Sequence, residues 1–270
     1  MQNVEPPGSL AHADPHAWWV PGMTLTPSAT SSGVSIPALM AEQRFALLAR
    51  ILYRLGFRDA LAGHLTIRRA DGHLLANPFP VGWDELCASD VCVISRDGEH
   101  LRGRERVSQA VELHVALHRE RPDLEIIVHN HPEWSTVWAC AGRIPPIYDQ
   151  TSANMDTDIA CVPYTGPVLD PAFAAALAQR LGRAEVALLE NHGVLVVGDS
   201  IDRVLWRAYV LERRCVMAWR VEAIGGGVAM PPKYVDINKD VLVSGFGGVF
   251  PGFFDYLARR EIRLDPGVLD

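Results

Sequence analysis

Apolar residues recur along this chain at two different spacings, which together predict a mixture of helices and short strands. In some segments apolar side chains return every three or four positions, which favours amphipathic helices. Elsewhere, short runs of branched apolar residues bounded by Gly, Asp and Pro favour strands. The predicted helices cover 37–56, 108–121, 170–183 and 202–223, with a short one near the C-terminus. The predicted strands cover 63–69, 72–78, 90–96, 125–130 and 160–168. One further strand is predicted after Asp97-Gly98, and two more within 186–200. The pattern predicts an α/β fold around a central, mainly antiparallel sheet.

The beginning of the chain differs from the rest. Residues 1–36 are rich in Pro, Gly, Ser, Ala and His and show little periodicity. We predict that they form an extended N-terminal arm and that residues 37–270 form a single domain. Pro37 suits the first turn of the helix that opens this domain, since its missing N–H is not needed there.

Composition and charge exclude several classes of partner. The chain has 270 residues, 49% of them hydrophobic, which is enough to bury a sizeable core. Its net charge of −7 and its lack of a basic stripe argue against nucleic acid, and no apolar stretch reaches the roughly 18 residues of a membrane span. There is no recognisable signal peptide, and the five cysteines show no C-x-x-C spacing. We therefore expect a cytoplasmic protein that binds neither nucleic acid nor membranes.

The first candidate for chemistry lies in EIIVHNHPEWS, residues 125–135, where an apolar run ends in His129-Asn130-His131. Side chains alternate along a strand, so the two histidines would project from one face with their α-carbons about 6.6 Å apart. Two neutral imidazoles at that separation can share one metal ion. Pro132 ends the strand because it has no N–H to donate. The pair is either part of a metal site or two surface histidines at a strand exit.

A third histidine, His192, stands in an Asn-His-Gly break between two apolar strands. A turn histidine is often only a polar loop residue, but a third ligand is what the H-x-H pair lacks. Three protein ligands leave coordination positions open, as in catalytic metal sites. We therefore predict that His129, His131 and His192 bind one divalent metal. His114 and His118, four residues apart on a predicted helix, are an alternative metal pair.

These segments resemble the class II aldolase/adducin family. The resemblance covers about residues 40–225 and rests on GHLTIRRADGHLLANPFPVGWDELCASDVCVIS, RPDLEIIVHNHPEWSTVWA and LLENHGVLVVG. In that family the matching histidines bind a divalent metal, which implies His129, His131 and His192 as ligands. The resemblance also implies a three-layer α/β/α sandwich and a homotetramer with sites near subunit interfaces. A non-catalytic, adducin-like interaction protein lacks the metal histidines, so their presence here favours an enzyme.

The helix before the metal strand departs from the sugar-phosphate aldolases of the family. Those enzymes carry Ser-Ser-Glu at its start, and that Glu is the acid/base, whereas this chain has Ser108-Gln109-Ala110. Glu112 follows two residues later, about 200° further around a helix of 3.6 residues per turn. Glu112 is a candidate catalytic residue only if the helix begins differently, and otherwise it is a solvated helix residue.

The substrate-binding turn departs as well. The aldolases hold phosphate with a Thr-Gly turn, whereas this chain has Asn77-Pro78-Phe79-Pro80. Phosphate binding favours backbone N–H groups and small residues, but the prolines remove two N–H groups and Phe79 adds bulk. His64 replaces an Asn of the aldolases, and it either donates to a substrate carboxylate or is a structural turn residue. We expect a small, non-phosphorylated aromatic 2-oxo acid contacted by His64, Asn77 and Phe79.

Two reactions do not require the missing acid/base, namely decarboxylation of a metal-chelated acid and oxygen activation at iron. Three histidines on Fe(II) leave about three positions of an octahedral shell for a 2-oxo acid and for dioxygen as co-substrate. The departures fit the family branch of nonheme iron oxygenases from novobiocin and clorobiocin (aminocoumarin antibiotic) biosynthesis. The resemblance implies their reaction, in which 3-dimethylallyl-4-hydroxyphenylpyruvate is converted to the mandelate and then to 3-dimethylallyl-4-hydroxybenzoate.

The alternative is a nonoxidative decarboxylase or an aldolase of the same family, acting on a non-phosphorylated substrate. It would use Zn(II) or another divalent metal, because three-histidine sites accept several metals. A substrate with an aromatic ring and a prenyl group would need an apolar pocket. Each candidate residue for this pocket could instead have a role in ordinary core packing. The candidates are Phe79, Trp83, Trp134, Trp138 and the loop 246–254.

Overall fold

The computed structural model describes residues 36, 38–164, 171–242 and 252–270, so the predicted arm at 1–36, apart from Ile36, and most of the loop at 246–254 lie outside the described residues. The helices are α1 (Ala41–Arg54), α2 (Val111–Glu120), α3 (Glu133–Cys140), α4 (Gln150–Ala153), α5 (Pro171–Leu181), α6 (Ile201–Ala223), α7 (Pro232–Asp240) and α8 (Phe253–Leu264). The strands are β1 (His64–Arg68), β2 (Leu74–Ala76), β3 (Cys92–Ile94), β4 (His100–Arg102), β5 (Ile126–Asn130), β6 (Ile159–Val162), β7 (Val186–Leu189) and β8 (Gly193–Gly198). Among the described helices none is both long and apolar enough to cross a membrane.

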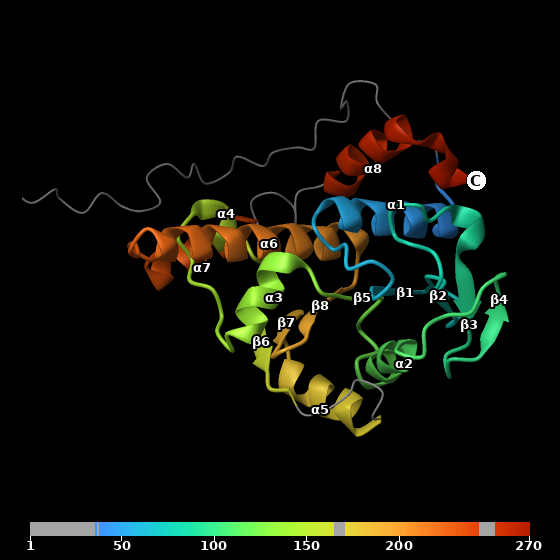
Figure 1. Cartoon of the computed structure of the whole chain (residues 1–270), viewed down its shortest axis with the longest axis horizontal. Helices are drawn as coiled ribbons and strands as arrows, with labels where there is room; N and C mark the ends of the chain where they lie inside the picture. Colours follow the sequence, from blue (N-terminus) through green and yellow to red (C-terminus); the bar gives the residue numbers. More distant parts are fainter. Residues whose placement is uncertain (1–35, 37, 165–170, 243–251) are drawn as a thin grey trace, which may run out of the picture. The chain divides into compact units, whose positions relative to one another are not determined.

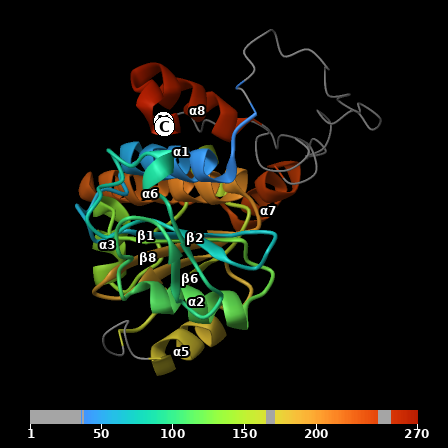
Figure 2. The ribbon, with the colours of Figure 1, turned by 90° about the vertical axis from the view of Figure 1, so that its right-hand side faces the viewer.

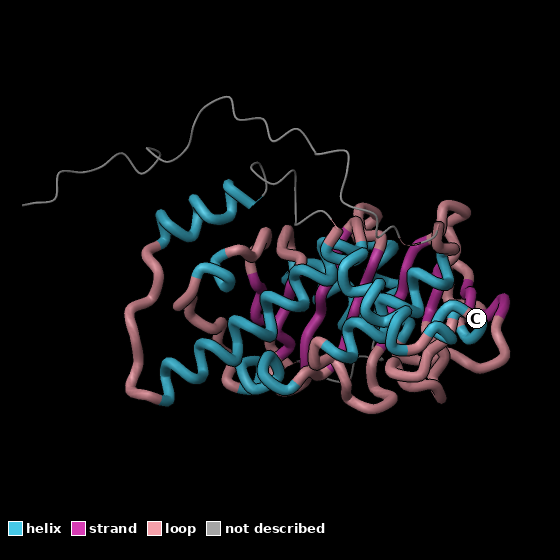
Figure 3. Tube along the Cα trace, turned by 90° about the horizontal axis from the view of Figure 1, so that it is seen from above, coloured by secondary structure: helices cyan, strands magenta, loops and turns pink. Residues whose placement is uncertain are grey.

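The eight strands form one sheet in the order β4-β3-β2-β1-β5-β8-β7-β6. Every pairing is antiparallel except that of β6 with β7, which confirms the predicted mainly antiparallel sheet. Figure 1 labels the strands, and Figure 3 shows them side by side with helices lying across them. Strand β5 occupies the centre, between β1 and β8.

Helices cover both faces of the sheet, as the three-layer α/β/α prediction requires. Helices α1, α6 and α8 lie on one face, and α2 and α5 lie on the other (Figure 2). The side chains of β5 point alternately into the two cores. Ile126 and Val128 pack with the first layer of helices, and Ile127 packs with the second. His129 continues the side of Ile127, the face that α2 and α5 cover.

Three short helices, α3, α4 and α7, have no counterpart in the sequence prediction. The start of α3 shows why, because its stabilising contact comes from far along the chain. The buried carboxylate of Glu212, on α6, accepts hydrogen bonds from the backbone N–H of Trp134 (3.3 Å) and of Ser135 (2.8 Å). Burial raises the pKa of Glu212, while these hydrogen bonds act in the opposite direction. Such a cap cannot be recognised from the local sequence.

A buried arginine joins α6 to the far half of the sheet. The Arg207 guanidinium is 1% exposed and contacts both carboxylate oxygens of Asp156, at 2.7 and 2.6 Å. It also donates to the Glu185 carboxylate (2.7 Å) and to the carbonyl oxygen of Val197 (2.7 Å). The two carboxylates therefore depend on Arg207 for their charge balance.

We expect the substitution Arg207→Met to lower the free energy of unfolding by about 3–5 kcal/mol, because it leaves two carboxylates without their buried partner. Urea unfolding followed by circular dichroism measures this change. The matched control is Arg203→Met, since Arg203 pairs with Asp199 at the surface and such pairs contribute about 0.5 kcal/mol. Equal losses in the two variants would show that Arg207 has no special structural role.

Candidate metal centre

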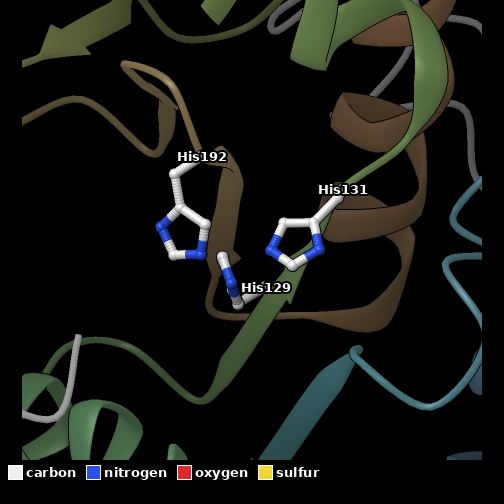
Figure 4. A group of neighbouring side chains, drawn as sticks. All are labelled: His129, His131 and His192. Carbon is white, nitrogen blue, oxygen red and sulfur yellow. The ribbon is translucent and has the colours of Figure 1, made fainter. Parts of the chain in front are cut away.

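Three histidines converge at the end of the central strands. His129 lies on β5, His131 follows two residues later, and His192 lies in the turn between β7 and β8. One ligand atom from each ring lies within 4.8 Å of the others, and the ring centroids are 4.7 to 5.0 Å apart. Figure 4 shows the three rings turned toward one another. The geometry is suited to a single metal ion, and the binding of one metal by these three histidines stays a prediction.

Strand pairing explains this convergence. Strands β5 and β8 pair antiparallel, with Asn130 opposite Val194, so the turn before β8 lies beside the end of β5. Gly193 permits the close approach, since a β-carbon there would lie 2.3 Å from the His131 ring and 2.6 Å from the Asn130 carbonyl oxygen. Asn191 has a φ of 54°, a left-handed conformation that Asn adopts more readily than most residues. The backbone thus accounts for Asn191 and Gly193 on either side of His192, the candidate ligand.

Hydrogen bonds orient two of the rings. Nδ1 of His129 lies 2.9 Å from the carbonyl oxygen of Val194, which can only accept, so this nitrogen carries the proton and Nε2 has the free lone pair. Nδ1 of His131 lies 2.6 Å from the Asp59 carboxylate. Nε2 of His131 is shielded from solvent and has no partner within the described part of the chain. A buried nitrogen left in this way fits a metal ligand.

Electrostatics favour the neutral form of His129 and His192. Burial, and then the neighbouring histidines, lower the pKa of His129 well below its usual range. Burial lowers the pKa of His192 to about 4, with His131 as the second cause. Both rings are therefore neutral at pH 7, the form in which imidazole binds metals.

His64 lies directly beside the three histidines. It begins β1, pairs with His129 in the sheet, and stacks on the His129 ring at 5.7 Å with an interplanar angle of 17°. Its Nδ1 is buried without a hydrogen-bond partner in the described structure, and burial lowers its pKa to about 4. Its position beside the ligands agrees with the predicted contact to substrate, which stays a prediction.

The alternative metal pair has a different role. His114 and His118, on α2, both contact the Thr66 hydroxyl, at 3.0 and 2.9 Å. Arg68 donates to the carbonyl oxygen of His118 (2.8 Å), which ties α2 further to β1. These histidines join a helix to the sheet, and they are absent from the metal-binding group found among the described residues.

The remaining predicted site residues lie outside that group. Helix α2 begins after Ala110, and Glu112 is exposed in its first turn. The Asn77 amide bridges backbone groups at the start of β1, since it accepts from Leu65 N–H (2.8 Å) and donates to Gly63 C=O (3.1 Å). This placement gives Asn77 a structural role. Phe79 is 36% exposed, with the Arg106 guanidinium 5.5 Å from its ring centre.

The proposed aromatic pocket is not assembled as the sequence suggested. Trp83, Trp138 and Phe254 are 3%, 3% and 1% exposed and belong to the core between the sheet and α1, α6 and α8. Trp134 lines a cavity of about 400 Å³ together with charged side chains, among them Glu212. Ordinary core packing, the competing role, therefore applies to Trp83, Trp138 and Phe254.

Sequence reasoning missed Asp59. It lies in the connection between α1 and β1, where a single acidic residue has no periodic or motif signal. Only the fold brings its carboxylate to His131.

The family profile, the related proteins and the solved structures that match this chain agree with one another. The profile described as Class II Aldolase and Adducin N-terminal domain matches residues 43–219. The 4-hydroxy-3-prenylphenylpyruvate oxygenase/4-hydroxy-3-prenylbenzoate synthase of Streptomyces roseochromogenus subsp. oscitans is 30% identical over 228 residues, covering 82% of this chain and 80% of that protein. The L-fuculose phosphate aldolase of Escherichia coli (strain K12) is 30% identical over 161 residues, covering 59% of this chain and 73% of that protein. An aldolase II superfamily protein from Pseudomonas syringae, 24% identical, superposes with a TM-score of 0.74 over 85% of this chain and 94% of its own.

We expect the substitution of any one of the three histidines with Ala to remove most of the bound divalent metal, because two ligands hold it too weakly. The metal content of purified His192→Ala, measured by elemental analysis with circular dichroism as a check of the fold, tests this. His100→Ala, on the exposed strand β4, is the control and should keep its metal. Full metal content in His192→Ala would contradict the assignment.

Proposed function

Because this chain belongs to the class II aldolase and adducin family, we propose that it is an Fe(II)-dependent enzyme that oxidatively decarboxylates a prenylated aryl 2-oxo acid. The proposed substrate is 3-dimethylallyl-4-hydroxyphenylpyruvate, converted through the mandelate to 3-dimethylallyl-4-hydroxybenzoate. The observation that carries the proposal is a group of three histidines that could hold one metal ion, combined with Ala110 at the position where the resemblance places the acid/base of the aldolases. The similarity to a prenylphenylpyruvate oxygenase over most of both chains supports the same reaction class.

In this proposal His129, His131 and His192 would hold the metal. A bound Fe(II) would supply electrons to dioxygen and bind the 2-oxo acid group, whereas Zn(II) could only polarise the acid. The protein contributes neutral ligands, since burial keeps His129 and His192 unprotonated. Histidine ligands place no negative charge directly on the metal, which favours an anionic, chelating substrate.

The proposed substrate contacts come from the β1 side of the centre. The unpartnered Nδ1 of His64 can donate to or accept from a substrate oxygen, depending on its tautomer. Phe79 follows two residues after Asn77, whose amide is hydrogen-bonded to the backbone of the two residues on either side of His64. Its exposed ring and the nearby Arg106 are suited to an aromatic acid.

We further propose that the protein acts in aminocoumarin antibiotic biosynthesis and assembles as a homotetramer. The first rests on the resemblance to the oxygenase branch of the family. The second is supported by apolar side chains left exposed on α3 and α6 and just beyond α6, where Val137, Trp219 and Ile224 are 46%, 46% and 84% exposed.

A nonoxidative decarboxylase or aldolase is the second candidate. It would share all three ligands, and the similarity to an L-fuculose phosphate aldolase at 30% identity favours it. The two candidates differ in whether dioxygen is consumed, and in whether a metal without redox chemistry supports turnover.

We expect release of carbon dioxide from an aryl pyruvate to require both Fe(II) and dioxygen, and label from ¹⁸O₂ to enter the product. Anaerobic reconstitution with Fe(II) or Zn(II), followed by oxygen-electrode and mass-spectrometric assays, measures both requirements. Equal rates under argon, or with Zn(II) in place of Fe(II), would favour the nonoxidative decarboxylase.

We also expect no appreciable aldol cleavage of fuculose 1-phosphate or rhamnulose 1-phosphate, since a positioned acid/base contributes about 10²–10⁴-fold and Ala110 stands in its place. A coupled assay for the released dihydroxyacetone phosphate tests this with the Zn(II)-loaded protein. Aldol cleavage that is observed with the wild-type protein and is absent from Glu112→Gln would show that Glu112 performs the proton transfer.

A further inference from the structure

The contact between Asp59 and His131 has a consequence for metal binding. We infer that Asp59 is a positioning residue of the metal centre, which fixes the His131 ring with Nε2 as its ligand atom and adds a negative charge behind it. The inference rests on the metal site of the proposed function. Its evidence is the 2.6 Å separation between the Asp59 carboxylate and Nδ1 of His131, together with the shielded, unpartnered Nε2 of the same ring.

The hydrogen bond determines which nitrogen can bind a metal. A carboxylate at this distance accepts the Nδ1 proton, so the lone pair of the neutral ring remains on Nε2. Carboxylates placed behind a metal-bound imidazole also raise its basicity and thus its affinity for the metal. Among the three histidines, His129 has a backbone carbonyl in this role and His131 has a carboxylate. His131 is therefore the ligand whose strength the protein adjusts with a charge.

The segment that carries Asp59 is held by a backbone turn and by close packing at Gly63. The Asp59 carbonyl oxygen accepts from the N–H of Ala62 (2.9 Å), which closes a turn around Ala60, a residue with a φ of 44°. Gly63 then packs so closely that a β-carbon there would lie 2.3 Å from the Asn130 side chain. The loop is thus fitted against the residue between the two β5-end histidines, and Asp59 is presented to His131 by the backbone.

Asp59 contributes little to folding by this contact, which separates the inferred role from a structural one. Its side chain is 50% exposed, and exposed pairs stabilise a fold only slightly. Within the described part of the chain, the one ion-pair partner of this carboxylate is His131. Its effect should consequently appear in the metal affinity rather than in the stability of the metal-free protein.

The test is the Co(II) affinity of the full chain, measured by competition with a chromogenic chelator at pH 7.5. Asp59→Ala should weaken binding about 10–100-fold, the usual effect of losing such a partner. Asp59→Asn, which keeps an acceptor oxygen without the charge, should recover part of that loss. Asp71→Asn is the matched control, because Asp71 is an exposed loop carboxylate that pairs with Arg69. The Co(II) affinity of this variant should equal that of wild type.

Two further measurements distinguish positioning from a general effect. The urea midpoint of the metal-free Asp59→Ala protein should match wild type, and the ¹⁵N imidazole shifts of His131 should show a loss of the fixed Nδ1–H form.

A Co(II) affinity of Asp59→Ala within twofold of that of wild type would overturn the inference. A wild-type protein that binds no divalent metal would overturn both this inference and the metal site. Co(II) binding by the wild-type protein, with the expected loss of affinity in Asp59→Ala, would support the inference whatever the reaction is. If the same wild-type protein takes up no oxygen with Fe(II), only the oxidative reaction is refuted.

Discussion

The antiparallel pairing of β5 with β8 is the contact on which the candidate site depends. It sets Asn130 opposite Val194, and so it places the turn that carries His192 against the end of the strand that carries His129. The pairing leaves no room for a side chain at Gly193, where a β-carbon would overlap the His131 ring. One backbone register thus brings together ligands from two distant segments.

The central position of β5 also decides the chemistry of the ligands. His129 is 1% exposed, between β1 and β8 and below the helices of one layer. Burial there disfavours the protonated ring and leaves a neutral ligand, while the Val194 carbonyl fixes its tautomer. His131 lies just beyond the strand and is more accessible, and a loop carboxylate takes the place of the backbone carbonyl. The candidate metal centre therefore combines one histidine oriented by the sheet with one oriented by a loop.

The departure from the sugar-phosphate aldolases extends beyond the loss of one carboxylate. Helix α2 begins just after Ala110, and its buried histidines hold the helix to Thr66 on β1. Glu112 points away from this buried face and is exposed. The segment at Asn77 is likewise fastened to the backbone of β1. Both segments therefore have structural contacts in this protein.

Local sequence patterns were sufficient for the strands, the long helices and the three candidate ligands. Branched apolar runs predicted the strands, and H-x-H with Asn-His-Gly predicted His129, His131 and His192, because these signals lie within a few neighbouring residues. The tertiary structure alone decided what depends on contacts between distant segments. In the folded chain Glu212 caps α3, and His114 and His118 share Thr66 as a hydrogen-bond partner. Trp83 and Trp138 lie in the core, and Asp59 contacts His131. Such contacts are set by strand register and helix packing, which no short stretch of sequence encodes.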